Sequence, residues 1–125
     1  MACILIAEDE ANIFQLVEFR LQRLGHEVLW AQDGEQALTL AVEHTPDLIM
    51  LDVMMPVLDG FQVLKRLKAN PETKAMPVIM LTARGQESDI VSGIENGASG
   101  YVVKPFSFPE LIARLNAALA QSGNA

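Results

Sequence analysis

The chain has 125 residues, 50% of them hydrophobic and 20% charged, and its formal net charge at pH 7 is −7. This length fits a single domain, and the net negative charge speaks against direct nucleic-acid binding by this domain. No apolar run reaches the roughly 18 residues of a membrane span and no signal-peptide pattern opens the sequence, so we expect a cytoplasmic protein with no membrane anchor. Cys3 is the only cysteine, which excludes an internal disulfide.

Short apolar segments alternate with segments of helical periodicity along the chain. Several apolar segments lack polar alternation, which is typical of strands that are covered on both faces. The predicted strands are Cys3–Glu8, Glu27–Ala31, Leu48–Asp52, Val78–Thr82 and Gly100–Lys104. Strict alternation of strands and helices, with right-handed crossovers, predicts an α/β fold in which helices cover both faces of a parallel sheet.

Between the strands, apolar residues recur at three- and four-residue steps, which predicts helices that include residues 14–24, 38–42, 64–67 and 111–118. Helix starts are indicated by Asp33 and Asp59, each three residues before a glutamine, and by a capping box at Ser107–Glu110. Helix ends are expected near Gly25 and Gly97, because glycine commonly follows the last turn of a helix.

Carboxylates follow two of the predicted strands. Glu8 and Asp9 come at the end of the first strand and Asp52 ends the third, while Thr82 and Lys104 close the fourth and fifth. The carboxyl ends of parallel strands meet at one edge of the sheet, where ligands bind. Three carboxylates there would repel one another by roughly 3 kcal/mol per close pair at an effective dielectric near 20. We therefore expect a cation to relieve the repulsion, and specifically a divalent metal.

These residue types together favour phosphoryl chemistry. A metal held by Asp9 and Asp52 would shield the negative charge of an incoming phosphoryl group, while Lys104 and the Thr82 hydroxyl could hold its other oxygens. The Asp52 carboxylate is then free to attack phosphorus and form an aspartyl phosphate. This form of covalent catalysis depends on positioning and charge neutralisation, and it needs no histidine base.

Four motifs, in order and at the predicted strand ends, match one family. They are Glu8-Asp9-Glu10, Leu51–Pro56 with Asp59-Gly60, Leu81-Thr82-Ala83 and Tyr101–Phe106. On these motifs the chain resembles the CheY-like receiver domain of bacterial two-component response regulators. The resemblance implies a single doubly wound, flavodoxin-like sheet of five parallel strands in the order 2-1-3-4-5 with five helices. It also implies that residues 1–121 form the receiver domain and that residues 122–125 are a tail or the start of a linker.

By this resemblance, Asp52 is the phospho-acceptor, and its phosphoryl group comes from the phosphohistidine of a sensor histidine kinase or from a phosphotransfer protein. The resemblance implies an Mg²⁺ ion, with Mn²⁺ as the alternative, held by Asp9, Asp52 and the backbone carbonyl of Met54. Glu8 would act on this ion largely through water. The chain would then be a signalling domain that promotes its own phosphorylation and dephosphorylation, and not an enzyme in the usual sense.

The resemblance also implies a conformational switch. Thr82 would move toward the bound phosphoryl group, which Lys104 also grips, and Tyr101 would rotate inward to fill the vacated space. The segment Gln86–Asn96 has low intrinsic helix propensity, so we expect a marginal helix that is easy to shift together with the fifth strand and the last helix. In this family the Lys104-Pro105 peptide bond is cis, which fits the need for a tight turn.

Some positions bear on the lifetime of the phosphoryl group and on dimerisation. Met54 and Arg84, each two residues beyond a key site residue, are expected to tune the lifetime of the phosphoryl group. The charged residues typical of dimerising receivers are replaced by Ser99-Gly100 and Ile90, so we expect a monomer or a weak phosphorylation-dependent dimer. The output would go to a downstream protein target or to an output domain that this sequence lacks.

Two other functions stay open at this point. A degenerate receiver would act as a phosphorylation-independent interaction module, and the intact set of site residues argues against it. A phosphatase with an aspartate nucleophile would need a second acid two residues after Asp52 as its general acid, and that position is occupied by Met54. The phosphatase is therefore the weaker of the two alternatives.

Overall fold

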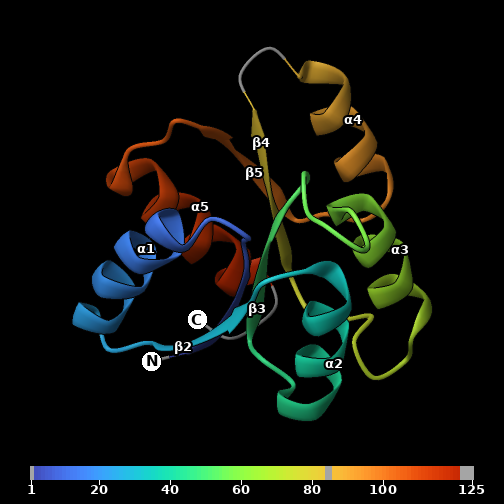
Figure 1. Cartoon of the computed structure of the whole chain (residues 1–125), viewed down its shortest axis with the longest axis horizontal. Helices are drawn as coiled ribbons and strands as arrows, with labels where there is room; N and C mark the ends of the chain where they lie inside the picture. The colour runs from blue at the N-terminus through green and yellow to red at the C-terminus, as the bar shows by residue number, and fades with distance from the viewer. Residues whose placement is uncertain (1, 84–85, 122–125) are drawn as a thin grey trace.

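The computed structural model describes residues 2–83 and 86–121, and strands alternate with helices throughout them (Figure 1). The strands are β1 (Cys3–Ala7), β2 (Glu27–Ala31), β3 (Leu48–Asp52), β4 (Val78–Ala83) and β5 (Gly100–Lys104). The helices are α1 (Ala11–Arg23), α2 (Gly34–His44), α3 (Gly60–Ala69), α4 (Glu87–Glu95) and α5 (Phe108–Gln121). Within these residues, each helix is too short or too polar to span a bilayer.

The strands form one parallel sheet in the order β2-β1-β3-β4-β5, which confirms the expected topology. The order of the strands reverses between β1 and β3, so the sheet is doubly wound. Figure 1 shows α1 and α5 on one face of the sheet and α2, α3 and α4 on the other. The carboxyl ends of β1 and β3 lie side by side, with Ala7 opposite Leu51, and their junction is the switch point at which such folds bind ligands.

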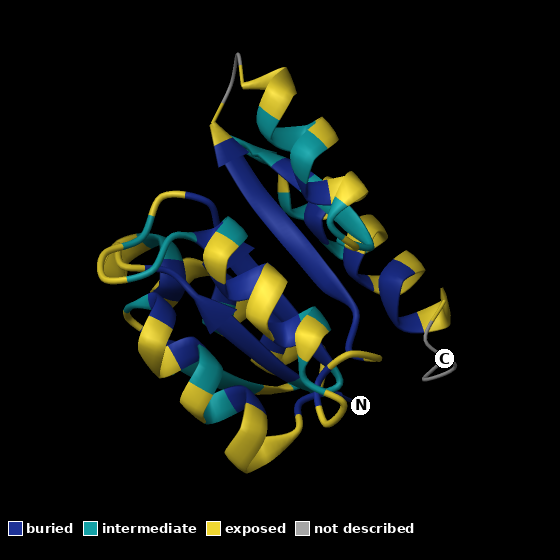
Figure 2. Ribbon diagram, turned by 90° about the vertical axis from the view of Figure 1, so that its right-hand side faces the viewer, coloured by how far each residue is buried: buried dark blue, intermediate teal, exposed yellow. Residues whose placement is uncertain are grey.

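Side chains of the central strands point alternately into two buried cores. Ile4 and Ile6 of β1 pack with residues of α1 and α5, whereas Leu5 and Ala7 pack with residues of α2 and α3. Figure 2 shows the buried sheet between helices whose outer faces are exposed. Each fully buried aliphatic side chain contributes about 1.5–3 kcal/mol. Burial on both faces explains why the central strands are apolar throughout.

The predicted capping residues lie at helix starts. Asp33 accepts a hydrogen bond of 2.8 Å from the backbone N–H three residues later, and Asp59 and Gln62 form a reciprocal capping box at the start of α3. Each such cap stabilises the helix by about 1 kcal/mol. Gly25 after α1 and Gly97 after α4 have φ values of 90° and 102°, which glycine adopts without strain, so the predicted ends of both helices are confirmed.

Two strand ends differ from the prediction by one residue. The prediction that β1 includes Glu8 is wrong, because the Glu8 carbonyl leaves the strand ladder. The Glu8 N–H still donates to the Ala31 carbonyl at 3.0 Å, but its own carbonyl accepts the indole N–H of Trp30 at 2.8 Å. β4 is longer than predicted, since Ala83 continues the pairing with β5 opposite Lys104.

Candidate functional site

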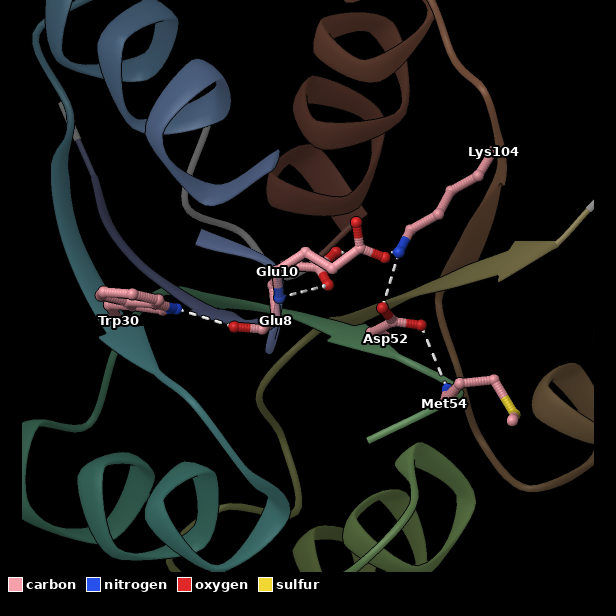
Figure 3. Close-up of polar contacts among 6 residues, drawn as sticks. All are labelled: Glu8, Glu10, Trp30, Asp52, Met54 and Lys104. Atoms are coloured by element: carbon pink, nitrogen blue, oxygen red, sulfur yellow. Dashed lines mark hydrogen bonds and ion pairs between the residues drawn. The ribbon is translucent and has the colours of Figure 1, made fainter. Parts of the chain in front are cut away.

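The predicted site residues Glu8, Asp52 and Lys104 lie together at the carboxyl edge of the sheet. Asp52 ends β3, Lys104 ends β5, and Glu8 follows directly after β1. Figure 3 shows the three side chains pointing toward one another. Asp9 completes the cluster, because Glu8, Asp9 and Asp52 each offer a carboxylate oxygen within 4.8 Å of the others. The topology thus brings residues far apart in the sequence into one acidic group.

Lys104 connects two of the carboxylates. Its Nζ lies 2.9 Å from Glu8 Oε1 and 2.6 Å from Asp52 Oδ2 (Figure 3). The backbone holds the other two oxygens: the N–H of Glu10 donates to Glu8 Oε2 at 3.2 Å, and the N–H of Met54 donates to Asp52 Oδ1 at 3.1 Å. Both carboxylates are therefore held in fixed orientations by the fold itself.

The charge balance of the cluster differs in one respect from the sequence-based expectation. A divalent metal is expected to relieve the repulsion among the acids, but in the structure the Lys104 ammonium supplies part of this relief. Burial raises the pKa of Glu8 to about 7, although the ion pair with Lys104 lowers it in part and Asp52 raises it further. Burial of Lys104 favours a lower pKa, yet its contacts with Asp52 and Glu8 outweigh burial and raise the pKa of the ammonium.

The stability of the metal-free protein is expected to fall with rising pH because of Glu8. The pKa of Glu8 is about 7 in the folded protein and has an ordinary value of 4.5, so folding strengthens proton binding. The stabilising contribution of the protonated side chain is complete below pH 4.5 and is lost as the pH rises through about 7. Glu8→Gln keeps the shape of the neutral side chain but does not titrate.

The measurement is the melting temperature of Glu8→Gln minus that of the parent protein, taken in chelator between about pH 5 and pH 8. This difference is expected to increase from about pH 5 to pH 7 and to level off above that, because only the parent protein loses stability as Glu8 ionises. A difference that is constant over the whole range would contradict the raised pKa of Glu8.

The oxygen donors of the cluster suit a hard divalent cation. Carboxylate and carbonyl oxygens are the ligands that Mg²⁺ and Mn²⁺ prefer, and three carboxylates at this spacing can share one ion. Met54 lies two residues after Asp52 at the rim of the site, and its side chain is 75% exposed. Glu8 is fully buried and already paired with Lys104, whereas Asp9 is exposed. The residues present therefore fit the metal that the family resemblance implies.

An open cleft of about 490 Å³ lies over the cluster. The residues that line it are Asp9, Glu10, Asp52, Val53, Met54, Ala83, Gln86, Asp89 and Lys104. Among the described residues that line it, four are acidic and one is basic, so these side chains repel an anion unless a cation accompanies it. The charge of these side chains therefore favours a cation over a lone anion in the cleft.

Thr82 is on β4, between the strands that carry Asp52 and Lys104. Its side chain is 1% exposed, and within residues 2–83 and 86–121 its hydroxyl oxygen has no hydrogen-bond partner. A buried polar group without a partner costs about 1–3 kcal/mol. The Thr82 hydroxyl therefore gains free energy from any ligand or movement that provides a partner.

Tyr101 on β5 is half-buried against the core that α2 and α3 cover. The guanidinium carbon of Arg114 on α5 lies 4.8 Å from the centre of its ring, a cation–π contact. α4 forms within the segment predicted as a marginal helix; it begins without a side-chain cap, and Gly93 is its only fully buried residue. At the end of β5, the Lys104-Pro105 peptide bond is cis.

Three residues near the cleft gain a role only from the structure. Gln86 and Asp89 line the cleft, and their position just after β4 is the signal that could have identified them. Trp30, whose ring stacks on Phe14, donates its indole N–H to the Glu8 carbonyl. Arg84, predicted to tune the phosphoryl lifetime, lies outside the described residues, as does the predicted tail at 122–125.

The strand order and the acidic cleft at the switch point place the chain in the flavodoxin-like class of α/β domains. The family model for the response regulator receiver domain matches residues 4–116. The alkaline phosphatase synthesis transcriptional regulatory protein PhoP of Bacillus subtilis is 48% identical over 120 residues, which are 95% of this chain and 49% of PhoP. The phosphate regulon transcriptional regulatory protein PhoB of Pseudomonas aeruginosa is 44% identical over 120 residues, which are 96% of this chain and 52% of PhoB.

Solved structures of response regulators have the same fold as this chain. The chemotaxis response regulator CheY4 of Vibrio cholerae superposes with a TM-score of 0.88 and 36% identity, over 94% of this chain and 98% of that one. The receiver domain of the Francisella response regulator 1452 gives a TM-score of 0.89 and 34% identity, over 98% and 99%. The chain belongs to the response regulator receiver family, whose members are signalling domains of two-component systems and interact with histidine kinases. It spans about half the length of the curated relatives it matches.

Proposed function

We propose that Asp52 accepts a phosphoryl group from the phosphohistidine of a sensor kinase or from a phosphotransfer protein, in a reaction that requires a divalent cation. The observation that carries this proposal is the setting of Asp52 in the wall of an open acidic cleft. One of its oxygens is held by Lys104 Nζ at 2.6 Å and the other by the N–H of Met54 at 3.1 Å. A carboxylate oriented in this way can attack phosphorus without a general base.

In the proposed step, an oxygen of Asp52 bonds to phosphorus while the bond between phosphorus and the donor's imidazole nitrogen breaks. The electron pair of the broken bond stays on that nitrogen, and the product is an acyl phosphate on Asp52. The Lys104 ammonium offsets part of the added charge. The Thr82 hydroxyl, which has no partner among the residues that the structure describes, becomes a hydrogen-bond donor once it moves toward the cleft.

We propose Mg²⁺ as the cation, with Mn²⁺ as the alternative. Asp9, Asp52 and the backbone carbonyl of Met54 would hold it, with Glu8 acting through water. The ion would shield the negative charges of the carboxylate and the phosphoryl group from each other. The three carboxylate oxygens within 4.8 Å of one another support this assignment.

Phosphorylation would switch the surface formed by α4, β5 and α5. As Thr82 moves toward the phosphoryl group, Tyr101 would leave the Arg114 guanidinium and turn inward. The sparse burial of α4 supports this part of the proposal, because a helix with little buried surface is easy to displace. Met54 and Arg84 would set the lifetime of the acyl phosphate by controlling access of water to it.

The whole of residues 1–121 would act as the receiver domain, in the cytoplasm, as a monomer or a weak phosphorylation-dependent dimer. Its output would be a downstream protein or an output domain joined to the receiver. PhoB and PhoP are named as transcriptional regulators. We assign no nucleic-acid contact to this domain itself, whose formal net charge is −7.

The test is phosphorylation of the purified protein by a small acyl or amido phosphate, followed by intact-mass measurement. We expect one added phosphoryl group per chain in Mg²⁺ and none in chelator, and the adduct should be lost in hydroxylamine, which cleaves acyl phosphates. Absence of the adduct at every Mg²⁺ concentration would favour the phosphorylation-independent module. Continuous phosphate release from many unrelated phosphate esters would favour the phosphatase.

A further inference from the structure

We propose that Trp30 is a positioning residue for the acidic cleft, because its indole N–H holds the backbone that carries Glu8 and Asp9. The inference rests on the proposed function and extends it to a side chain of β2, outside the four site motifs. It concerns how the chain prepares the cation-binding oxygens, and not the phosphoryl transfer itself.

Both backbone polar groups of Glu8, its N–H and its carbonyl, form hydrogen bonds with β2. The indole Nε1 of Trp30 donates to the Glu8 carbonyl at 2.8 Å (Figure 3), and the Glu8 N–H donates to the Ala31 carbonyl at 3.0 Å. A peptide unit is planar, so fixing the Glu8 carbonyl also fixes the N–H of Asp9 and the direction in which the chain enters Asp9. The Trp30 bond therefore limits where the Asp9 carboxylate can point.

The turn between β1 and α1 needs such a restraint. Glu10 is the N-cap of α1, yet its side chain forms no cap hydrogen bond, and the first turn of α1 contains no acidic residue to stabilise the helix start. Asp9 itself is exposed. Anchorage of this turn thus depends on the two hydrogen bonds with β2, on the ion pair of Glu8 with Lys104 and on the Glu10 N–H bond to Glu8 Oε2.

The indole ring is in turn held in place by α1. Trp30 and Phe14 stack with ring centres 4.4 Å apart and planes 6° from parallel. Phe14 is buried in the core beneath α1. The stack fixes the direction of the N–H, and it separates two roles of Trp30: the ring packs against α1, and the N–H holds the turn. A variant can remove the second role while keeping the first.

The experiment compares Trp30→Phe with Trp30→Leu by calorimetric titration with Mg²⁺ alone. Phenylalanine keeps an aromatic ring against Phe14 but has no N–H, whereas leucine lacks both the aromatic ring and the N–H. We expect the Kd for Mg²⁺ to weaken about 3- to 10-fold in both variants, the effect of losing one hydrogen bond. The metal-free melting temperature should be lower in Trp30→Leu than in Trp30→Phe.

Phosphorylation by a small phosphodonor supplies a second readout. At saturating Mg²⁺ both variants should be labelled as fast as the parent protein, while the half-saturating Mg²⁺ concentration rises by the same factor as the Kd. An unchanged Kd in Trp30→Phe overturns the inference, and weakening confined to Trp30→Leu overturns it in favour of ring packing. If the parent protein binds no Mg²⁺ or gains no phosphoryl group, the proposed function fails as well, so the two failures are distinguishable.

Discussion

Asp52→Asn is expected to abolish phosphoryl transfer from a small phosphodonor. The amide oxygen of asparagine is a poor nucleophile toward phosphorus, and the acyl phosphate requires a carboxylate. Asparagine has the same shape as aspartate, and its oxygen can still accept a hydrogen bond from Met54 or Lys104, so we expect the variant to stay folded. The measurement is intact mass under conditions in which the parent protein is fully labelled.

Asp9→Asn is the matched control for this loss. It also removes a carboxylate of the acidic cluster, but it leaves the proposed acceptor in place. We expect Asp9→Asn to be labelled once the Mg²⁺ concentration is raised, whereas Asp52→Asn should stay unlabelled at every concentration. Labelling of Asp52→Asn at the rate of the parent protein would place the acceptor elsewhere in the chain.

Gly60→Ala is expected to destabilise the protein by about 3 kcal/mol or more, the upper part of the range for overpacking a buried site. A Cβ at Gly60 would lie 2.5 Å from the carbonyl oxygen of Asp52 and 2.9 Å from the Cα of Val53. These backbone atoms belong to residues 52–59, which lead from the end of β3 to α3 and are called the acceptor loop. The Gly60 N–H also donates to the Val53 carbonyl at 2.9 Å. Relief of the clash must displace the loop, so labelling of Asp52 should slow as well.

The measurement is the free energy of unfolding in urea, with Gly100→Ala as the matched control. A Cβ at Gly100 meets nothing within 4 Å, so its substitution should change stability by no more than about 0.5 kcal/mol. If Gly60→Ala proved as stable as Gly100→Ala, this result would contradict the close contact between Gly60 and the backbone of the acceptor loop.

Much of this architecture could be predicted from the sequence, because local patterns determine it. β3 and β5 have the predicted bounds, and Asp33 and Asp59 cap the helices that follow them. The position of the acidic cluster could also be predicted, since a parallel sheet brings the carboxyl ends of its strands to one edge. Glu8 and Asp52 therefore lie together, although 44 positions separate them in the sequence.

Other features depend on packing that leaves no periodic signal. The hydrogen bond from Trp30 to the Glu8 carbonyl joins residues 22 positions apart and requires the indole to be turned by its stack on Phe14. The position of Lys104 at the end of a strand predicts where its backbone lies, but not that its ammonium bridges two carboxylates. Burial of the Thr82 hydroxyl, with no partner in the described part of the chain, likewise depends on how neighbouring strands cover it.

The bridge from Lys104 to Glu8 and Asp52 gives the protein a tethered counter-ion of its own. The chain itself thereby supplies part of the positive charge that offsets the repulsion between these two acids. A cation bound as proposed would share Asp52 with the Lys104 ammonium, which lies 2.6 Å from Asp52 Oδ2. If the proposed ion left the cleft, Glu8 and Asp52 would still share the Lys104 ammonium between them.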